Sequence, residues 1–553
     1  MKDKTITSKT SLVLTLSLSI LFITSGPKVI RETCDDLGYM LIAAGAFGPD
    51  SQYLLYPNPI LGYILKLFYY LIPQMNWYLF FQYFFNVISC ASLVYIFSDK
   101  TKGLLKLLLP ILLGIYTSHD FFLSVQFTVN SFIYIITGFI IIFESINSEK
   151  AKYSSFGIFL IILSFLTRWN CALFILPFCI VMMIYYSVSY NTSNPRYLLR
   201  KIYPFFIALL FSTILILLSH LLFQKGNDWD EYNHFLKYNT SITDYEPAIY
   251  DNHPYEYKQS GITELDIVIL NNLISMDTET YTNENLEKIV KIKSQDQDQS
   301  LRINNSILSE ISRVFGNMLS KNSWMHILIL VSILFLIINK QWAKCVTIAV
   351  LFGGMIIEEW FLVCAGRALY RVCIGPFMAF ELLTLYIFLS SFSTPLQFNK
   401  TISIAGITIS FLLLLIIFFQ PDDEWWQGDE ASVLNELSRD KDNIYVLDSW
   451  ILYNDGLGIK NYMTVSPSNY SGYFDNMVFA GGFIAHAPNI SRAGLNNPVR
   501  ELVNDRVYWV TMSVYGNQLT EVLRCYLEEK LQRDVSCSLI IDINGIQVWK
   551  FRT

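Results

Sequence analysis

The chain has 553 residues, of which 53% are hydrophobic and only 16% charged, and its formal net charge is −6. A soluble protein would have about 25% charged residues, so lipid rather than water must solvate most of this chain. Residues 225–321 contain 16 acidic and 9 basic side chains, and residues 421–553 contain 18 and 11, so both polar blocks are acidic. Nucleic-acid binding requires a basic exposed face, and these blocks exclude that class of function.

Apolar runs long enough to cross a bilayer recur along the chain, and the first follows the basic residues Lys2, Lys4 and Lys9. We interpret this run as an uncleaved membrane helix rather than a signal peptide, because many apolar runs follow it and no clear cleavage site does. Hydropathy predicts about eleven spans. They fall near residues 11–24, 77–97, 104–117, 121–144, 154–167, 170–187, 202–223, 324–339, 344–364, 370–391 and 401–419.

The apolar stretch 60–72 is treated separately from these spans. It lies between Pro59 and Pro73 and carries Lys66 near its middle. Because a span needs about 20 residues and disfavours a central charge, we expect an interfacial helix on the outer leaflet. Counting this stretch as a span would invert the orientation of everything that follows it.

The charges of the loops between spans alternate and therefore predict an orientation. The expected cytoplasmic loops contain Lys100 with Lys102, Lys150 with Lys152, Arg196 with Arg200 and Lys201, Lys340 with Lys344, and Lys400. The expected outer loops contain the acidic residues. By the positive-inside rule, the chain is a multi-pass cell-membrane protein with a cytoplasmic N-terminus and an extracytoplasmic C-terminal domain.

The fold class expected is an α-helical polytopic membrane protein with two extracytoplasmic parts. The transmembrane domain comprises residues 1–224 and 322–420, a loop insertion comprises residues 225–321, and residues 421–553 form a small α/β domain. An insertion of this length is typical of a lid or a binding element.

Periodicity predicts secondary structure in both polar parts. The insertion should contain amphipathic helices at 265–274 and 284–292, followed by a polar hinge at 295–300. The C-terminal domain should contain strands at 443–447 and 507–511, a helix at 519–531, and a hairpin of 538–543 with 547–551. The turn of that hairpin, Asn544-Gly545, is a strong hairpin signal.

Asp35 and Asp36 are the first candidates for chemistry, because two adjacent carboxylates directly after a membrane helix have no apolar role. A carboxylate just outside a bilayer can act as a general base or bind a divalent cation. The alternative is structural: the pair would cap a helix that begins at Leu37, since Asp is a preferred N-cap residue.

Three short motifs carry a resemblance to a known family. They are Asp35-Asp36-Leu-Gly-Tyr-Met, then Pro57-Asn-Pro-Ile-Leu-Gly-Tyr-Ile-Leu-Lys66, and later Trp229-Asp-Glu-Tyr-Asn. Together with the eleven spans and the polar C-terminal domain, they resemble the GT-C glycosyltransferase superfamily, and more narrowly the uncharacterised GT-C-like membrane proteins of Gram-positive gut bacteria. The resemblance covers roughly residues 10–420 and rests on short motifs.

The resemblance implies a donor, an acceptor and a catalytic base. The donor would be a polyprenyl-phosphate-linked sugar held among membrane lipids, and the acceptor a glycan or another component of the cell envelope. Asp35 or Asp36 would be the base, and we favour Asp35. Many GT-C enzymes have a second acidic motif in a later outer loop; the nearest counterpart here, His119-Asp120, departs from that pattern. It would bind a metal or orient the acceptor, or it is simply solvated.

Arginines would bind the phosphate leaving group, which requires cationic or amide partners. Arg367 and Arg371 lie in a short outer turn, and their i, i+4 spacing would place them on one helical face. Arg168 lies in another outer turn and is a third candidate. The alternative is that these arginines contact lipid headgroups. The preceding acidic pair, Glu358-Glu359, is expected to form an intramembrane ion pair with Arg367 or Arg371.

The sequence lacks the common nucleotide-binding and zinc-protease motifs, and two functions other than glycosyl transfer are compatible with it. The sequence has no Walker loop, no dinucleotide-binding fingerprint and no zinc-protease motif, so a divalent cation is the only cofactor it suggests. A transporter or flippase of lipid-linked glycans would place ionisable residues deep in the bilayer, and Glu144 and Glu381 are the residues that would support it. A non-catalytic scaffold that binds a glycan is the remaining alternative.

Overall fold

The computed structural model describes residues 7–25, 34–48, 51–147, 153–189, 195–225, 228–243, 247–300, 305–321, 323–392, 394–419, 430–453 and 466–553. Lys2, Lys4, Lys150 and Lys152 lie outside the described residues, as do the side chains of Arg196, Arg200 and Lys201. The chain forms two compact units. Unit 1 comprises Met1–Thr33, Phe80–Leu218 and Asn304–Asp423, and unit 2 comprises Cys34–Leu79, Ser219–Ile303 and Glu424–Thr553. Residues 34–79, which the sequence-based division assigned to the transmembrane domain, therefore belong to the same unit as most of the insertion and the C-terminal domain.

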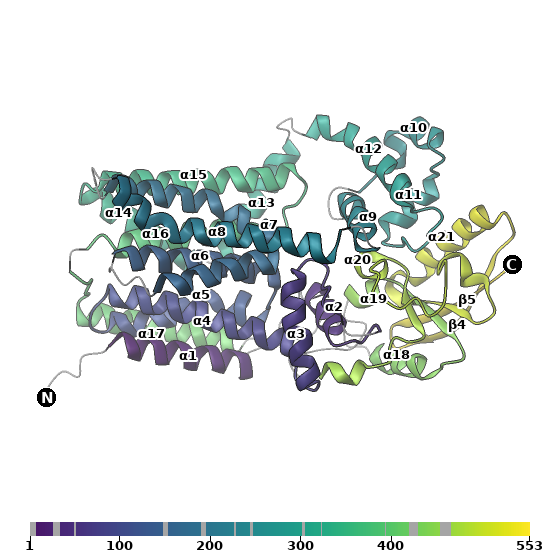
Figure 1. The fold of residues 1–553 in the computed structure, drawn as a ribbon, viewed down its shortest axis with the longest axis horizontal. Coiled ribbons are helices and arrows are strands. Elements are labelled where there is room, and N and C mark those ends of the chain that lie inside the picture. The colour runs from purple at the N-terminus through teal and green to yellow at the C-terminus, as the bar shows by residue number, and fades with distance from the viewer. Residues whose placement is uncertain are drawn as a thin grey trace. The chain divides into compact units, whose positions relative to one another are not determined.

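Unit 1 is a bundle of long apolar helices (Figure 1). Its elements are α1 (Ser8–Ser25), α4 (Trp77–Asp99), α5 (Leu105–Thr117), the π-helical turn η1 (Ser118–Leu123), α6 (Phe127–Asn147), α7 (Ser154–Ser189), α8 (Pro195–Phe223), α13 (Asn305–Lys321), α14 (Ser323–Ile338), α15 (Trp342–Cys364), α16 (Tyr370–Leu389) and α17 (Lys400–Phe418), of which α4 and α8 each extend into unit 2 at one end. Within the described residues, nine helices are long and apolar enough to cross a membrane. The chain is therefore a membrane-embedded protein.

Helix α7 is folded back on itself at Arg168, whose φ of −159° and ψ of 92° are not helical. The first residue of α7, Ser154, hydrogen-bonds Ser145 of α6 (Oγ to Oγ, 2.5 Å). Near the other end of α7, the ring of Tyr186 stacks on Phe143 of α6, with centroids 4.7 Å apart. Both ends of α7 therefore lie beside the same end of α6, so its two halves run in opposite directions.

The expected span at 121–144 is displaced. Residues 118–123 continue α5 as η1, and α6 begins only at Phe127. The break is stabilised locally, because the Gln126 side-chain oxygen accepts hydrogen bonds from the backbone N–H groups of Thr128 (2.7 Å) and Val129 (3.2 Å) at the start of α6. These donors have no partner within a helix, and a side-chain acceptor satisfies them.

The two ends of the unit 1 bundle carry different sets of loops. At one end, Lys100 forms an ion pair with Glu144 (2.8 Å), and Thr101 forms a β-bridge with Leu396. The opposite end holds η1, the reversal at Arg168 and the turn between α15 and α16. Loops that carry lysines and loops that carry the candidate site residues are therefore on opposite ends of this unit.

Unit 2 combines short helices with one mixed sheet. Its elements are α2 (Cys34–Ala43), α3 (Pro59–Leu71), α9 (Asp228–Thr243), η3 (Tyr250–Asn252), α10 (Pro254–Gln259), α11 (Glu264–Asn271), α12 (Asn283–Ser300), α18 (Glu430–Arg439), β1 (Ile444–Leu447), α19 (Trp450–Tyr453), η4 (Pro467–Tyr470), β2 (Met477–Phe479), α20 (Gly482–Ala485), η5 (Arg500–Val503), β3 (Val507–Met512), α21 (Ser513–Leu531), β4 (Ser536–Ile543) and β5 (Ile546–Arg552). The strand order is β2-β1-β3-β5-β4. Strand β1 is parallel to β2 and β3, whereas β5 is antiparallel to β3 and β4.

The predicted strands, helix and hairpin of the C-terminal domain are all present. Asn544 and Gly545 have φ values of 50° and 81°, as the two central residues of a type I′ turn require. The predicted hinge at 295–300 is wrong, since α12 continues to Ser300.

The insertion closes the carboxyl edge of the parallel strands, where α/β sheets usually bind ligands. The backbone N–H groups of Ser275 and Met276 both donate to the carbonyl of Ala480, directly after β2 (3.0 and 2.8 Å). Ser449, which follows β1, donates from its hydroxyl to the carbonyl of Leu273 (3.0 Å). A Cβ at position 481 would collide with that carbonyl, so Gly481 permits this close approach. Part of the insertion therefore occupies the usual ligand position.

Asp277 joins the insertion to the C-terminal domain. Its side chain is fully buried and accepts hydrogen bonds from Arg500 Nε (2.9 Å), Asn497 Nδ2 (2.8 Å), the Tyr526 hydroxyl (2.8 Å) and, within the insertion, the Thr280 hydroxyl (2.9 Å). Burial by itself opposes ionisation of this carboxyl, but the hydrogen bonds from Asn497, Arg500 and Tyr526 outweigh it and lower the pKa of Asp277.

Replacing Asp277 by Asn should lower the free energy of unfolding by about 3 kcal/mol, because it removes the buried carboxylate that pairs with Arg500 and leaves that arginine only the exposed carboxylate of Glu279. The native pKa of Asp277 is below that of the unfolded chain, so its stabilisation is complete above about pH 4 and is lost as the pH falls through the native pKa. The variant should therefore lose less stability in acid than the wild type. Denaturant unfolding of the detergent-solubilised protein between pH 3 and 7 measures both effects, with the exposed Asp251→Asn as the control.

Candidate functional site

The acidic pair Asp35-Asp36 lies in the first turn of α2, in unit 2. Asp36 is completely buried and accepts a hydrogen bond from the hydroxyl of Tyr78 (2.8 Å), whereas Asp35 is 7% exposed. The unpaired N–H groups at a helix N-terminus favour negative charge, so the fold itself supports both carboxylates. Both aspartates are therefore buried within the helix rather than capping it from outside, because the helix begins three residues before the expected Leu37.

Helix α2 is buried along its length from Asp35 to Ala43. The ring of Tyr39 makes edge contacts with Tyr78 and Phe483, with centroids 6.2 and 6.1 Å away. A Cβ on Gly38 would approach the Ile484 side chain to 2.6 Å, so the glycine lets α2 lie close to the segment that follows β2. The acidic pair is therefore held on a rigid, buried helix, which suits a group that must keep one orientation.

The three arginines converge at one end of unit 1. Arg168 lies at the reversal of α7, Arg367 in the turn between α15 and α16, and Arg371 in the first turn of α16. The thiol of Cys171 interacts electrostatically with the guanidinium groups of all three. All three arginines are partly exposed. The predicted common helical face is wrong, because α16 begins at Tyr370; a turn with Gly366 at φ 67° places Arg367 instead.

Arg168 is held by contacts on both sides of its side chain. Its Nη1 donates to the Thr128 hydroxyl (2.6 Å), and the guanidinium carbon lies 4.9 Å from the centroid of the Phe127 ring. A guanidinium over an aromatic face is stabilised by a cation–π interaction. The first two residues of α6 thus position the charge, which limits the conformational entropy that binding an anion would cost.

His119 and Asp120 lie in η1, at the same end of unit 1, and Asp120 is only 6% exposed. His119 Nδ1 is 2.8 Å from Asp120 Oδ1, and the Tyr370 hydroxyl donates to both carboxylate oxygens (3.1 and 3.0 Å). The interpretation of this pair as simply solvated is therefore wrong for Asp120. Tyr370 directly precedes Arg371, so the carboxylate and the arginine group are linked by adjacent residues of α16.

Glu381 is a second buried carboxylate in unit 1, and the sequence identifies it only as a residue that would support a transporter. Glu381 is 1% exposed, accepts a hydrogen bond from the Tyr116 hydroxyl (2.6 Å) and lies 3.1 Å from His326 Nδ1. The sequence did not predict that Tyr116 and His326 would contact Glu381. The one available signal was His326 itself, a lone imidazole near the start of an apolar run.

The predicted ion pair between Glu358-Glu359 and the arginines is wrong. Glu359 is buried beside the thiol of Cys373 on α16 and forms no ion pair within the described part of the chain. Helix α15 ends at Cys364 and the chain turns before Arg367, which carries the arginine away from the preceding turns of α15.

The candidate residues thus fall into two groups. Asp35 and Asp36 belong to unit 2, and Arg168, Arg367, Arg371, His119 and Asp120 belong to unit 1. Within the described part of the chain, no group of three or more His, Cys, Asp and Glu residues has the arrangement of a metal site.

No protein-family model matches the chain, and no curated protein matches it either.

Replacing Tyr78 by Phe should lower the free energy of unfolding by about 2 kcal/mol, because a buried carboxylate loses a hydroxyl donor. The matched control is Tyr95→Phe, since Tyr95 is 40% exposed and its hydroxyl makes no hydrogen bond within the described residues. Thermal unfolding of both variants in detergent measures the difference. Equal stability of the two variants would show that the Tyr78 hydroxyl does not support Asp36.

Proposed function

We propose that this protein is a GT-C-like membrane glycosyltransferase that moves a sugar from a polyprenyl-phosphate-linked donor to an extracytoplasmic cell-envelope glycan. The convergence of Arg168, Arg367 and Arg371 at one end of an apolar helix bundle carries this proposal. The leaving group of such a donor is an anionic phosphate at the membrane surface. Arginine is the side chain best suited to bind phosphate, because its planar fork presents several N–H donors at once.

The proposed topology has eleven spans. The nine helices long enough to cross a membrane become ten when the two halves of α7 count separately, and the shorter helix Trp324–Ile338 is the eleventh. The end of unit 1 that carries Lys100 faces the cytoplasm, in accordance with the positive-inside rule. The arginine end then faces outward, where positive charge has no topological role and is available for the donor phosphate.

Helix α3 supports a location of unit 2 at the outer membrane surface. Its side chains Leu67, Tyr70 and Leu71 are 57%, 83% and 62% exposed, although all three are apolar or aromatic. Its other side, including Leu65 and Tyr69, is buried. We propose that the exposed side lies in the lipid headgroup region, as amphipathic interfacial helices do.

In the proposed reaction, a carboxylate of the acidic pair removes the proton from an acceptor hydroxyl. The hydroxyl oxygen attacks the anomeric carbon from the side opposite the phosphate, the carbon–oxygen bond to the phosphate breaks, and the configuration inverts. Arg367 and Arg371 stabilise the charge on the departing phosphate. Asp35 is the better base, because it is 7% exposed, whereas Asp36 is completely buried. The free energy comes from the activated donor.

Substitution of the acidic pair tests this reaction. Asp35→Asn should lower the transfer rate by about 10²–10⁴-fold, the usual contribution of a general base. The assay uses full-length protein in proteoliposomes, polyprenyl-phosphate-linked hexoses and pentoses as donors, and cell-wall glycan as acceptor. Arg371→Gln should also reduce transfer, with partial recovery in Arg371→Lys, and Asp251→Asn serves as the control. Full transfer by both Asp35→Asn and Asp36→Asn, in correctly inserted protein, would rule out the mechanism.

A transporter or flippase of lipid-linked glycans is the second candidate, favoured by one observation. Glu381 is buried within α16, away from solvent, between Tyr116 and His326. Buried ionisable groups in membrane helices often mark proton-coupled transport. If the protein is a transporter, Glu381→Gln should abolish movement of a fluorescent polyprenyl-phosphate sugar across proteoliposomes. If the protein is a transferase, Glu381→Gln should retain most of the transfer activity. In that case neither the wild type nor the variant should move the lipid across the membrane.

A further inference from the structure

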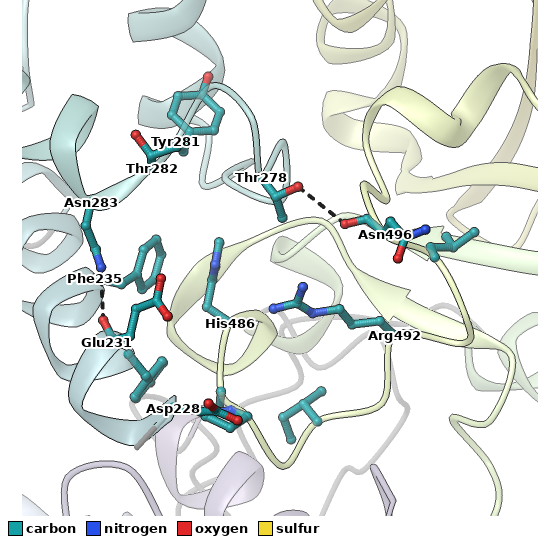
Figure 2. Close-up of a pocket in the computed structure, with 15 residues that line it drawn as sticks. Asp228, Glu231, Phe235, Thr278, Tyr281, Thr282, Asn283, His486, Arg492 and Asn496 are labelled. Carbon is teal, nitrogen blue, oxygen red and sulfur yellow. Dashed lines mark hydrogen bonds between the residues drawn. The ribbon is translucent and has the colours of Figure 1, made fainter. Parts of the chain in front are cut away.

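Unit 2 contains a pocket that is lined by none of the residues assigned a role in the proposed reaction (Figure 2). Its volume is about 630 Å³, within the range of pockets that bind small molecules. One wall comes from α9 and the segment after Asp277, and the other from the segment that follows α20. The residues that line it are Asp228, Glu231, Tyr232, Phe235, Thr278, Tyr281, Thr282, Asn283, His486, Ala487, Pro488, Ile490, Arg492, Leu495 and Asn496.

Charged groups of opposite sign face this pocket. Figure 2 shows the guanidinium of Arg492 extending toward His486, with Glu231 and Phe235 of α9 beyond it. Within the described part of the chain, Arg492, Asp228 and Glu231 form no ion pair, in contrast to the neighbouring Arg500, which is fully engaged by Asp277 and Glu279. Charged side chains that converge without neutralising one another are available to a ligand.

A neutral histidine and a phenylalanine form an apolar surface in the pocket. The rings of His486 and Phe235 stack with centroids 3.7 Å apart. His486 Nε2 donates to the carbonyl of Ser275 (3.1 Å), which sets the tautomer of the ring. Burial, and then the nearby Arg492 guanidinium, lower the pKa of His486 to about 3, so the ring carries no charge at neutral pH.

We propose that this pocket binds a carboxylated oligosaccharide, such as one containing uronic acid residues, as the acceptor. The proposal rests on the proposed function and names the acceptor of that reaction. Arg492 pairs with the sugar carboxylate. The carboxylates of Asp228 and Glu231 and the amide of Asn283 hydrogen-bond the hydroxyls, and the apolar surface formed by Phe235 and His486 contacts the sugar ring.

Two features of the pocket select this ligand over its competitors. A single arginine beside two carboxylates favours a monoanionic carboxylate, because a phosphate dianion would meet stronger repulsion from Asp228 and Glu231. A pocket of about 630 Å³ is also larger than a single amino acid. A small zwitterion would therefore leave most of the amide and hydroxyl groups that line the pocket without a hydrogen-bond partner. An oligosaccharide of two or three residues supplies hydroxyls for them.

Calorimetry with the full-length protein in nanodiscs tests the proposal. The probe is aldotriouronic acid, a trisaccharide with a single carboxylate, and the reference is the neutral sugar maltotriose. The wild type should bind the acidic trisaccharide at least 10-fold more tightly, and the difference should shrink as salt is added, since a partly exposed ion pair is screened. Arg492→Gln should remove this preference with little change in maltotriose affinity. Arg492→Lys should keep part of it, because the charge remains but the planar fork is lost.

Matched controls make the result decisive. Arg506→Gln removes an exposed arginine of the same unit that does not line the pocket, and it should bind as the wild type does. Thermal unfolding verifies that each variant is folded. The proposal is overturned if aldotriouronic acid does not bind, if Arg492→Gln binds it unchanged, or if the zwitterion trialanine binds more tightly. Transfer without binding of aldotriouronic acid would overturn only this inference. Binding without any transfer would overturn the proposed function alone.

Discussion

The buried carboxylate of Asp277 is the interaction on which the organisation of unit 2 depends. It lies in the insertion, and three of its partners, Asn497, Arg500 and Tyr526, come from the C-terminal domain. A second ion pair, Lys530 to Asp266 at 2.6 Å, joins the same two parts. Because a buried charge is costly without partners, these contacts hold only one arrangement of the insertion on the sheet. That arrangement covers the carboxyl edge of the strands and forms the walls of the pocket.

Two of the three candidate carboxylates, Asp36 and Asp120, are held in different ways. Asp36 combines a helix N-terminus with the Tyr78 hydroxyl, so its charge is stabilised by fixed dipoles. Asp120 instead has an imidazole at 2.8 Å and both oxygens bonded by Tyr370. Each arrangement keeps a charged oxygen in one orientation while leaving little of it exposed. Such preorganised groups act on a substrate without first reorganising, which is the main requirement for electrostatic catalysis.

The local sequence pattern predicted much of the secondary structure, because secondary structure depends mainly on residues that are close in sequence. The strands of the C-terminal domain, the Asn544-Gly545 hairpin and the reversal near Arg168 follow from alternation, turn chemistry and hydropathy. The start of α6 could not be found this way, because Phe121, Phe122 and Leu123 are as apolar as the span that follows them. The break after them depends on the Gln126 side chain bonding backbone groups further along the chain. Hydropathy does not record such bonds.

The sequence by itself determined that this is a membrane protein and which ionisable residues lie in or beside its apolar segments. It also determined that Arg168, Arg367 and Arg371 share one end of the helices. Composition and spacing are enough for that. Only the tertiary structure decided that Asp36 is buried under Tyr78, that Glu359 meets Cys373 rather than an arginine, and that His486 and Arg492 face α9 across a pocket. These pairs are separated by between 14 and about 260 positions in the sequence. Local periodicity cannot predict contacts between residues so far apart in sequence. These contacts form only when the helices and strands of a whole unit pack together.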